Sequence, residues 1–314
     1  MKLITPPQKT RSAHRRWLHT LPLPVLEAGL LLSWSSGFVG ARFSIDYAPA
    51  LLVVFWRCVV ITLLLFPFVY RSLLKTPFWL WAKHAGIGLL AMAGYMLGVT
   101  QGIAFGVPAG LAALCADMLP LGMALLAAAF LGERLGRRVW LGLVIGMAGV
   151  IGTTYGALSM GNAPLWAYAL PIAGMLSLAI ATLWQKRIRD AHTLPLLPNL
   201  WLQCFVSSIA FAVIEGSQHS LVPPPSVGFA MSVVWTVTLP TFGGYGLYWL
   251  CLRRSSATRV ATVLYLSPPI TMLWAWAMFD EPLSWQMAVG MAISTVGIRL
   301  VLRAERRHAH ADAA

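Results

Sequence analysis

The sequence has few charged residues. Of its 314 residues only 11% are Asp, Glu, Lys or Arg, whereas 58% are hydrophobic. A soluble globular protein has roughly a quarter charged residues, because its surface must stay in contact with water. This shortage excludes an ordinary cytosolic enzyme, a secreted disulfide scaffold and a disordered tail protein.

The chain also lacks the spaced ligands of a metal site or a disulfide framework. Its four cysteines, at positions 58, 115, 204 and 251, are far apart, and each lies in an apolar run. No Cys-x-x-Cys or Cys/His pair has metal-ligand spacing. No Gly-x4-Gly-Lys-Ser/Thr motif is present for ATP. We therefore expect neither a metal nor a cofactor.

Long apolar runs are abundant. A transmembrane helix needs about 20 largely apolar residues, and no run shows the alternation of a membrane β-barrel. The predicted fold is an all-α polytopic membrane protein with ten transmembrane helices. These cover residues 22–42, 48–69, 82–102, 109–131, 139–156, 166–185, 195–214, 229–252, 258–278 and 284–302.

The basic residues fall on one side of this topology. All but two of the 23 Lys and Arg residues lie in the N-terminal tail, in alternate loops or at the C-terminal end; the exceptions are Arg42 and Arg57. Because Lys and Arg accumulate in cytoplasmic loops, we predict an inner-membrane protein with both termini cytoplasmic. The net charge of +13 is then an orientation signal. Charges scattered over short loops do not make a nucleic-acid surface.

Residues 109–156 and 257–304 resemble each other at a constant offset of 148. Each copy belongs to a set of five predicted spans, and five is odd, so the second set enters the membrane from the opposite side. Inverted repeats characterise secondary transporters, whose substrate site lies near the midplane between the halves. The coinciding residues include Pro120 with Pro268, Glu133 with Glu281, Gly142 with Gly290, and Gly149 with Gly297.

Three segments carry a resemblance to a known family. They are WSSGFVGARF (34–43), FWRCVV (55–60) and the pattern P-x12-E-x-L-x6-G-x6-G, which runs from Pro120 and again from Pro268. Together they resemble the EamA-type halves of the drug/metabolite transporter superfamily. The resemblance implies a bacterial cytoplasmic-membrane permease that commonly exports amino acids or other small metabolites without ATP.

The implied organisation has five parts. Two five-helix repeats at 22–156 and 166–303 are joined by an outer linker at 157–165. They are flanked by a basic cytoplasmic tail at 1–21 and a cytoplasmic tail at 304–314.

Two charged residues lie deep in the predicted spans, where ionisable groups are costly and indicate function by default. By helix rise, Arg57 and Asp117 both lie roughly 12–14 Å from the outer side. They can form a structural ion pair or contact a charged part of the substrate, and Asp117 can instead carry a coupling proton. The family's second helix often has an arginine at the place of Arg57, whereas Asp117 is no part of the family pattern.

Prolines interrupt the fourth and ninth spans at equivalent positions. Each proline removes a backbone donor, and matching interruptions in two halves point to a central site. Pro120, Pro268 and Pro269 are the candidate helix breaks. Aromatic rings at nearby depths can stack on a ring or shield a cation. The candidate residues for substrate binding or coupling are Trp34, Arg57, Tyr95, Asp117, Tyr245 and Tyr265.

Small residues recur every fourth position, as in Gly94, Gly98 and Gly102, and again in Gly142-x-x-x-Gly146. Such faces allow close helix approach, and we expect packing roles, with a homodimer through the second set as the alternative. Glu133 and Glu281 lie near the starts of helices, where acidic residues are favoured, and are expected to be structural.

The sequence favours a secondary transporter that exports a small metabolite by alternating access, with proton coupling as an option. Its partners are the small-molecule substrate and the lipid bilayer. A membrane-embedded enzyme is one alternative, weakened by the absence of an acid/base pair, a nucleophile motif or a metal-ligand cluster. A non-transporting membrane interaction protein is the other.

The Asp117 hypothesis predicts that Asp117→Asn abolishes transport while the protein still inserts and folds. Amide and carboxylate have nearly the same size, so only the charge and the proton are removed. Flux and membrane content measured together check this. Wild-type flux in the variant would remove Asp117 from the mechanism.

Overall fold

The computed structural model describes residues 21–131, 136–158, 163–187, 194–217, 220–254, 260, 263–264 and 266–311. These ranges contain helices and no strand, as expected for a chain in lipid, where a helix satisfies its own backbone N–H and C=O groups. The helices are α2 (Leu23–Ser44), α3 (Ala50–Lys75), α4 (Phe78–Gly88), η1 (Leu89–Gly94), α5 (Tyr95–Ala104), α6 (Ala109–Asp117), α7 (Leu119–Leu131), α8 (Arg137–Leu158), η2 (Leu165–Tyr168), α9 (Ala169–Lys186), α10 (Leu196–Gly216), α11 (Val227–Thr236), η4 (Val237–Gly244), α12 (Tyr245–Arg254), α14 (Ser267–Phe279) and α15 (Trp285–Ala311).

Six stretches of helix in the described residues are long and apolar enough to cross a membrane. They are α2, α3, α4 to α5, η2 to α9, α10, and α11 to α12. A seventh is the pair α6 and α7, which is bent by 41° at its break. The three other predicted spans coincide with α8, α14 and α15. Every predicted span therefore contains a helix, and six of these stretches, or seven with the bent pair, are long and apolar enough to cross a membrane.

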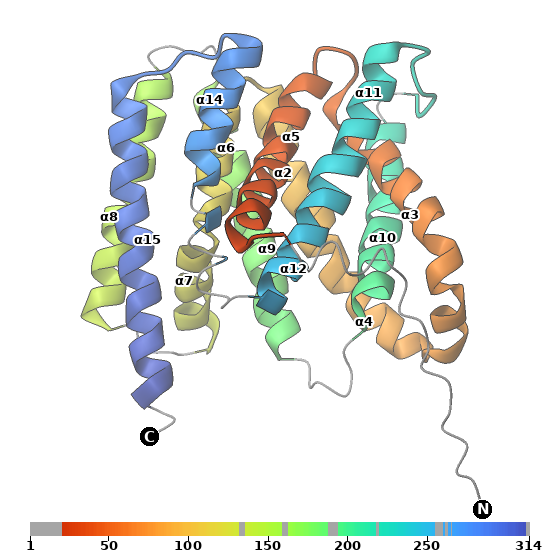
Figure 1. Ribbon diagram of the computed structural model, residues 1–314, viewed down its shortest axis with the longest axis horizontal. Coiled ribbons are helices and arrows are strands. Elements are labelled where there is room, and N and C mark those ends of the chain that lie inside the picture. The colour runs from red at the N-terminus through yellow and green to blue at the C-terminus, as the bar shows by residue number, and fades with distance from the viewer. Residues whose placement is uncertain are drawn as a thin grey trace, which may run out of the picture.

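Helices α8 and α15 lie side by side at one edge of the molecule (Figure 1). A Cβ atom on Gly142 would lie 2.8 Å from the Gly297 carbonyl oxygen, and one on Gly149 would lie 2.6 Å from that of Gly290. Residue numbers thus rise along one helix as they fall along the other, so the two run antiparallel. These helices are each other's equivalents in the 148-residue repeat. Glycine is required because any side chain would separate the backbones.

The predicted packing role of the glycines is confirmed. Gly98 lies against Gly174 of α9, and Gly102 lies against Pro171 of the same helix. Gly142 faces α15, and Gly146 lies against Leu121 of α7. The Gly142/Gly146 face is therefore covered within the chain, and a homodimer would need another surface.

The centre of the bundle is α6, in which every residue from Ala109 to Ala116 is buried. Around it, α2 packs against α6, α14 and η4, while α5 packs against α9. Helices α3 and α10 form the edge opposite α8 and α15 (Figure 1). Most of the buried side chains are apolar, but His84, Glu215 and several serines and threonines are also buried.

Two π-helices occupy equivalent places in the two halves. η1 ends at Gly94 and is followed by Tyr95, and η4 ends at Gly244 and is followed by Tyr245. π-segments inside helices occur frequently at functional sites. They place one tyrosine from each half directly after a local widening of the helix.

One end of the bundle carries the basic helix termini. The C-terminal ends of α3, α9, α12 and α15 and the N-terminal ends of α4 and α8 face the same side (Figure 1). These termini carry Arg and Lys residues. Arg42 and Asp46 lie at the opposite end of α2, before α3 begins. The asymmetry read from the sequence therefore corresponds to two chemically different ends of the fold.

Gly297→Ala is expected to destabilise the protein by about 1–3 kcal/mol, because the added Cβ overlaps the Gly146 backbone and α15 must move away. The thermal unfolding temperature of the detergent-solubilised chain measures the effect. Gly246→Ala is the matched control, since nothing lies within 4 Å of a Cβ there, and alanine favours a helix. Equal unfolding temperatures for the two variants would contradict the packing argument.

Candidate functional site

A cavity of about 90 Å³ lies between α2, α3, α5 and the segment from α11 to α12. Four of the six candidate residues line it: Trp34, Arg57, Tyr95 and Tyr245. Arg57 is the one charged side chain among the described residues of the lining. The fold therefore brings together residues that are far apart in the sequence, in a mostly apolar space.

Arg57 is positioned by the opposite half of the chain. Its side chain is buried, with 7% of the residue exposed, and its Nε donates a hydrogen bond of 3.2 Å to Thr241 Oγ1. Thr241 belongs to η4, and its hydroxyl donates in turn to the Thr236 carbonyl at 2.8 Å. The hydrogen bond to the Thr236 carbonyl thus fixes the orientation of the Thr241 hydroxyl, whose oxygen accepts the hydrogen bond from the guanidinium.

Aromatic rings form one wall of this region. The Trp34 ring lies 6.1 Å from the Tyr245 ring and 6.1 Å from the Tyr248 ring, centroid to centroid. These are distances at which aromatic pairs attract each other. α2 thereby contacts α12 through rings, and Trp34 is held from two sides at the cavity.

The ion pair between Arg57 and Asp117 is absent, so that alternative is wrong. In the described part of the chain, neither Arg57 nor Asp117 takes part in an ion pair. Asp117 ends α6 and does not line the cavity, and its Oδ2 atom is buried without a hydrogen-bond partner.

The candidate prolines lie in the first turns of helices. Pro120 follows Leu119 at the start of α7, after the bend at Met118. Pro268 and Pro269 follow Ser267 at the start of α14. Proline is tolerated there because the first N–H groups of a helix have no partner within it. Tyr265, the sixth candidate, lies outside the described residues, as does Glu133.

Sequence reasoning missed four hydroxyl residues. Thr241 holds Arg57, while Ser44, Thr100 and Thr236 line the cavity. Each of the three lining hydroxyls donates to the carbonyl four residues earlier in its own helix. Serine and threonine can satisfy their hydroxyls in this way within a helix, so sequence alone carried no signal that separated these residues from others.

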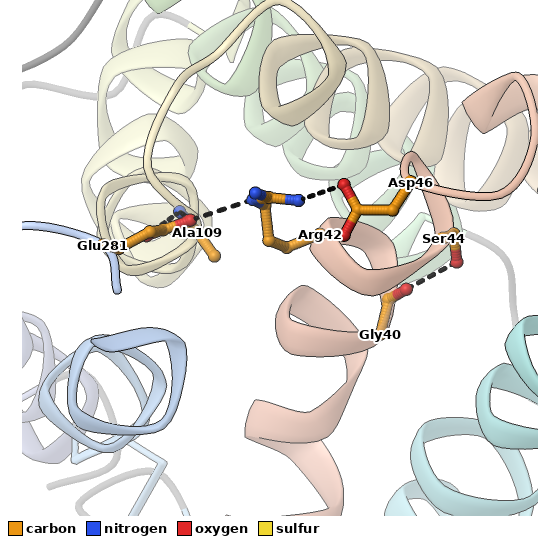
Figure 2. Close-up of polar contacts among 6 residues, drawn as sticks. All are labelled: Gly40, Arg42, Ser44, Asp46, Ala109 and Glu281. Carbon is orange, nitrogen blue, oxygen red and sulfur yellow. Dashed lines mark hydrogen bonds and ion pairs between the residues drawn. The ribbon is translucent and has the colours of Figure 1, made fainter. Parts of the chain in front are cut away.

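A second polar cluster joins the two halves at the end of the bundle opposite the basic termini. Figure 2 shows the Arg42 guanidinium between Asp46 and Glu281. Arg42 Nη1 lies 2.9 Å from Asp46 Oδ1, and Arg42 Nε lies 3.6 Å from Glu281 Oε1. The guanidinium carbon also lies 4.8 Å from the centre of the Phe279 ring.

Glu281 caps the N-terminus of a helix other than the one expected. Its Oε2 accepts a hydrogen bond of 3.1 Å from the backbone N–H of Ala109, the first residue of α6 (Figure 2). The sequence placed this carboxylate at the start of its own next helix. It instead satisfies the N-terminus of a helix from the first half, where a negative charge is stabilised. Residues of both halves, among them Pro108 and Glu281, line a cavity of about 280 Å³ next to this contact.

Comparison with known proteins identifies the family. The family model described as the EamA-like transporter family matches residues 25–155 and 165–303, which cover both halves. The chain belongs to the EamA-like transporter family. The resemblance read from the two P-x12-E-x-L motifs is thereby confirmed, and the chain is a membrane transporter rather than an enzyme.

Relatives with curated names agree. The chain is 26% identical over 285 residues to a "Probable amino-acid metabolite efflux pump" of Escherichia coli (strain K12), covering 87% of this chain and 92% of the relative. It is 26% identical over 285 residues to the "Uncharacterized inner membrane transporter YedA" of the same strain, covering 90% and 91%. A protein of known crystal structure shares the fold, with a TM-score of 0.61 at 20% identity, covering 91% of this chain and 98% of that one.

Glu281 predicts a pH dependence of stability. Burial raises the pKa of its carboxyl above the ordinary value, while the Ala109 N–H and Arg42 lower it by less. As the pH falls through the raised pKa, the folded protein binds the proton before the unfolded chain does. Lowering the pH from neutral should therefore stabilise the wild type relative to Glu281→Gln. Unfolding temperatures of both proteins across pH 4 to 8 check this; parallel curves would contradict it.

Proposed function

We propose that this EamA-family transporter exports a small metabolite, an amino acid or a similar compound, across the inner membrane by alternating access. The observation that carries the proposal is the cavity between the two halves, with Arg57 buried in its wall. Buried charges inside membrane bundles mark substrate or ion pathways. Trp34, Tyr95 and Tyr245 complete the site.

The packing supports ten spans in two inverted five-helix repeats. α8 and α15, equivalent by sequence, run antiparallel, as the ends of two inverted copies must. The contact of α5 with α9 has a counterpart in the contact of α2 with η4 and α12. Such an arrangement permits the two halves to rock about a central site.

The proposed route runs through the cavity to one end of the bundle. Ser44 and Ala50, which flank the connection from α2 to α3, line the cavity together with Arg57. This connection lies at the end opposite the basic termini, which the positive-inside rule assigns to the outside. The termini of the chain are then cytoplasmic. Alternating access requires this outer end to close when the inner end opens, and Asp117 is the candidate carrier of a coupling proton.

The names of the relatives support the substrate class. Two curated relatives, from Escherichia coli and Salmonella typhimurium, are named probable amino-acid metabolite efflux pumps. A small metabolite also suits a cavity of about 90 Å³, since drug-sized ligands occupy pockets of about 300 Å³ or more.

Filling the cavity should stop transport. Ala41 lines it, and Ala41→Leu should reduce the export of amino acids, measured as efflux from overexpressing cells and as uptake into everted vesicles, by about tenfold or more. Ala230→Leu, on an exposed face of α11, is the matched control and should behave as wild type. Absence of flux for all amino acids tested would overturn the proposed substrate class. Full flux through Ala41→Leu would place the site elsewhere.

A further inference from the structure

We propose that Arg57 binds the carboxylate of the substrate and is the group by which the transporter selects its cargo. This inference rests on the proposed function and names the substrate class: small molecules with one carboxylate, recognised by that group rather than by an amino group.

The first argument is the cost of an unpaired buried cation. A guanidinium within a membrane protein is paired with acids or carbonyls in nearly all cases. Arg57 is buried, yet among the described residues its one hydrogen bond goes from Nε to the neutral Thr241 hydroxyl. Asp117, the acid at similar depth, does not pair with it. A bound anion would supply the missing counter-charge.

The second argument is geometric. A guanidinium has five N–H donors in a rigid fork. Nε is committed to Thr241, which η4 orients through its bond to Thr236. This leaves the N–H groups of the two terminal nitrogens, in a side chain that lines the cavity. Two parallel N–H donors match the two oxygens of a carboxylate.

The third argument is the charge balance of the cavity. In the described part of the lining there is one cation and no acid. The carboxylate of a substrate neutralises that cation. A phosphate dianion would bring a second negative charge, and the hydroxyl oxygens of the lining, whose protons are already donated to helix carbonyls, can accept hydrogen bonds from an ammonium group but cannot donate to a further phosphate oxygen. A substrate bearing only a positive charge would be repelled by Arg57. The charge therefore argues against a site in which Trp34, Tyr95 and Tyr245 cage a substrate whose only charge is positive.

The fourth argument concerns what the cavity offers to an amino group. Ser44, Thr100 and Thr236 have already given their hydroxyl protons to helix carbonyls, so their oxygens are available as acceptors. These neutral oxygens tolerate an ammonium group, but they provide no opposite charge. Binding should consequently depend strongly on the carboxylate of an amino acid and weakly on its ammonium group.

Matched ligands test this without altering the protein. For each of alanine, leucine and phenylalanine, the probes are the L-amino acid, its amide, the amine without the carboxylate and the acid without the amino group. Competition for amino-acid uptake into proteoliposomes containing the full chain measures their apparent affinities. The acids, with or without the amino group, should compete about 10- to 100-fold better than the amides and amines, the range for losing charge-assisted hydrogen bonds. Inorganic phosphate should not compete.

Variants then assign the selectivity to Arg57. Arg57→Gln should abolish the preference for acid over amide, and Arg57→Lys, which keeps the charge but loses the fork, should retain part of it. Arg71→Gln is the matched control on α3, because Arg71 is exposed and interacts with its neighbour Tyr70. If Arg57→Gln does not fold, the ligand series with wild-type protein still decides the substrate class.

The outcomes separate the two proposals. Equal competition by acids and amides overturns the carboxylate inference and leaves the transport function standing. A preference for acids that survives Arg57→Gln overturns the role of Arg57, as does a variant that lowers the unfolding temperature without changing the ratio. Competition by phosphate would replace the carboxylate with a phosphate group as the ligand. No uptake of any amino acid would overturn the proposed function, and the inference with it.

Discussion

Arg57 places a guanidinium charge among buried helices without a carboxylate beside it, and burying an unpaired charge costs free energy. Arg57 belongs to the first half of the chain and Thr241 to the second, so the hydrogen bond between them exists only when both halves are in place. In η4 the Thr241 hydroxyl donates its proton to the Thr236 carbonyl, and this hydrogen bond leaves the Thr241 oxygen facing Arg57 as an acceptor. The cavity thus lies where the helix is widened and where the two halves meet, and its chemistry follows from that meeting.

Close backbone contact holds the halves together elsewhere. At the crossing of α8 with α15, a Cβ atom on Gly142, Gly149, Gly290 or Gly297 would overlap the facing helix, and Ser294 donates to the Gly146 carbonyl at 3.1 Å. In lipid, apolar burial gives little preference for one helix neighbour over another, so shape and hydrogen bonds select the partner. Glu281 of the second half adds another polar contact between the halves, because its carboxylate accepts a hydrogen bond from the first backbone N–H of α6 in the first half.

Much of the architecture was predictable because bilayer thickness and backbone hydrogen bonding leave few choices. Apolar runs located helices at every predicted span, and the motif repeated at an offset of 148 revealed the two halves. Residue type and depth identified Trp34, Arg57, Tyr95 and Tyr245 as candidates. The same reasoning failed for Arg57 and Asp117, because equal depth along two helices says nothing of the direction in which each side chain points. It also missed Thr241, which sequence does not distinguish from any other threonine in a span.

The sequence alone determined the environment, the helical class, the repeat and the family of this protein, because hydropathy and repeated motifs are local properties that need no knowledge of neighbours. Only the tertiary structure decided which groups meet. It placed Asp117 outside the lining of the cavity that contains Arg57, gave Arg57 a threonine in place of a carboxylate, and moved Glu281 from its own helix to the start of α6. These outcomes depend on helix rotation and crossing, which are set by the packing of small residues between segments far apart in the chain.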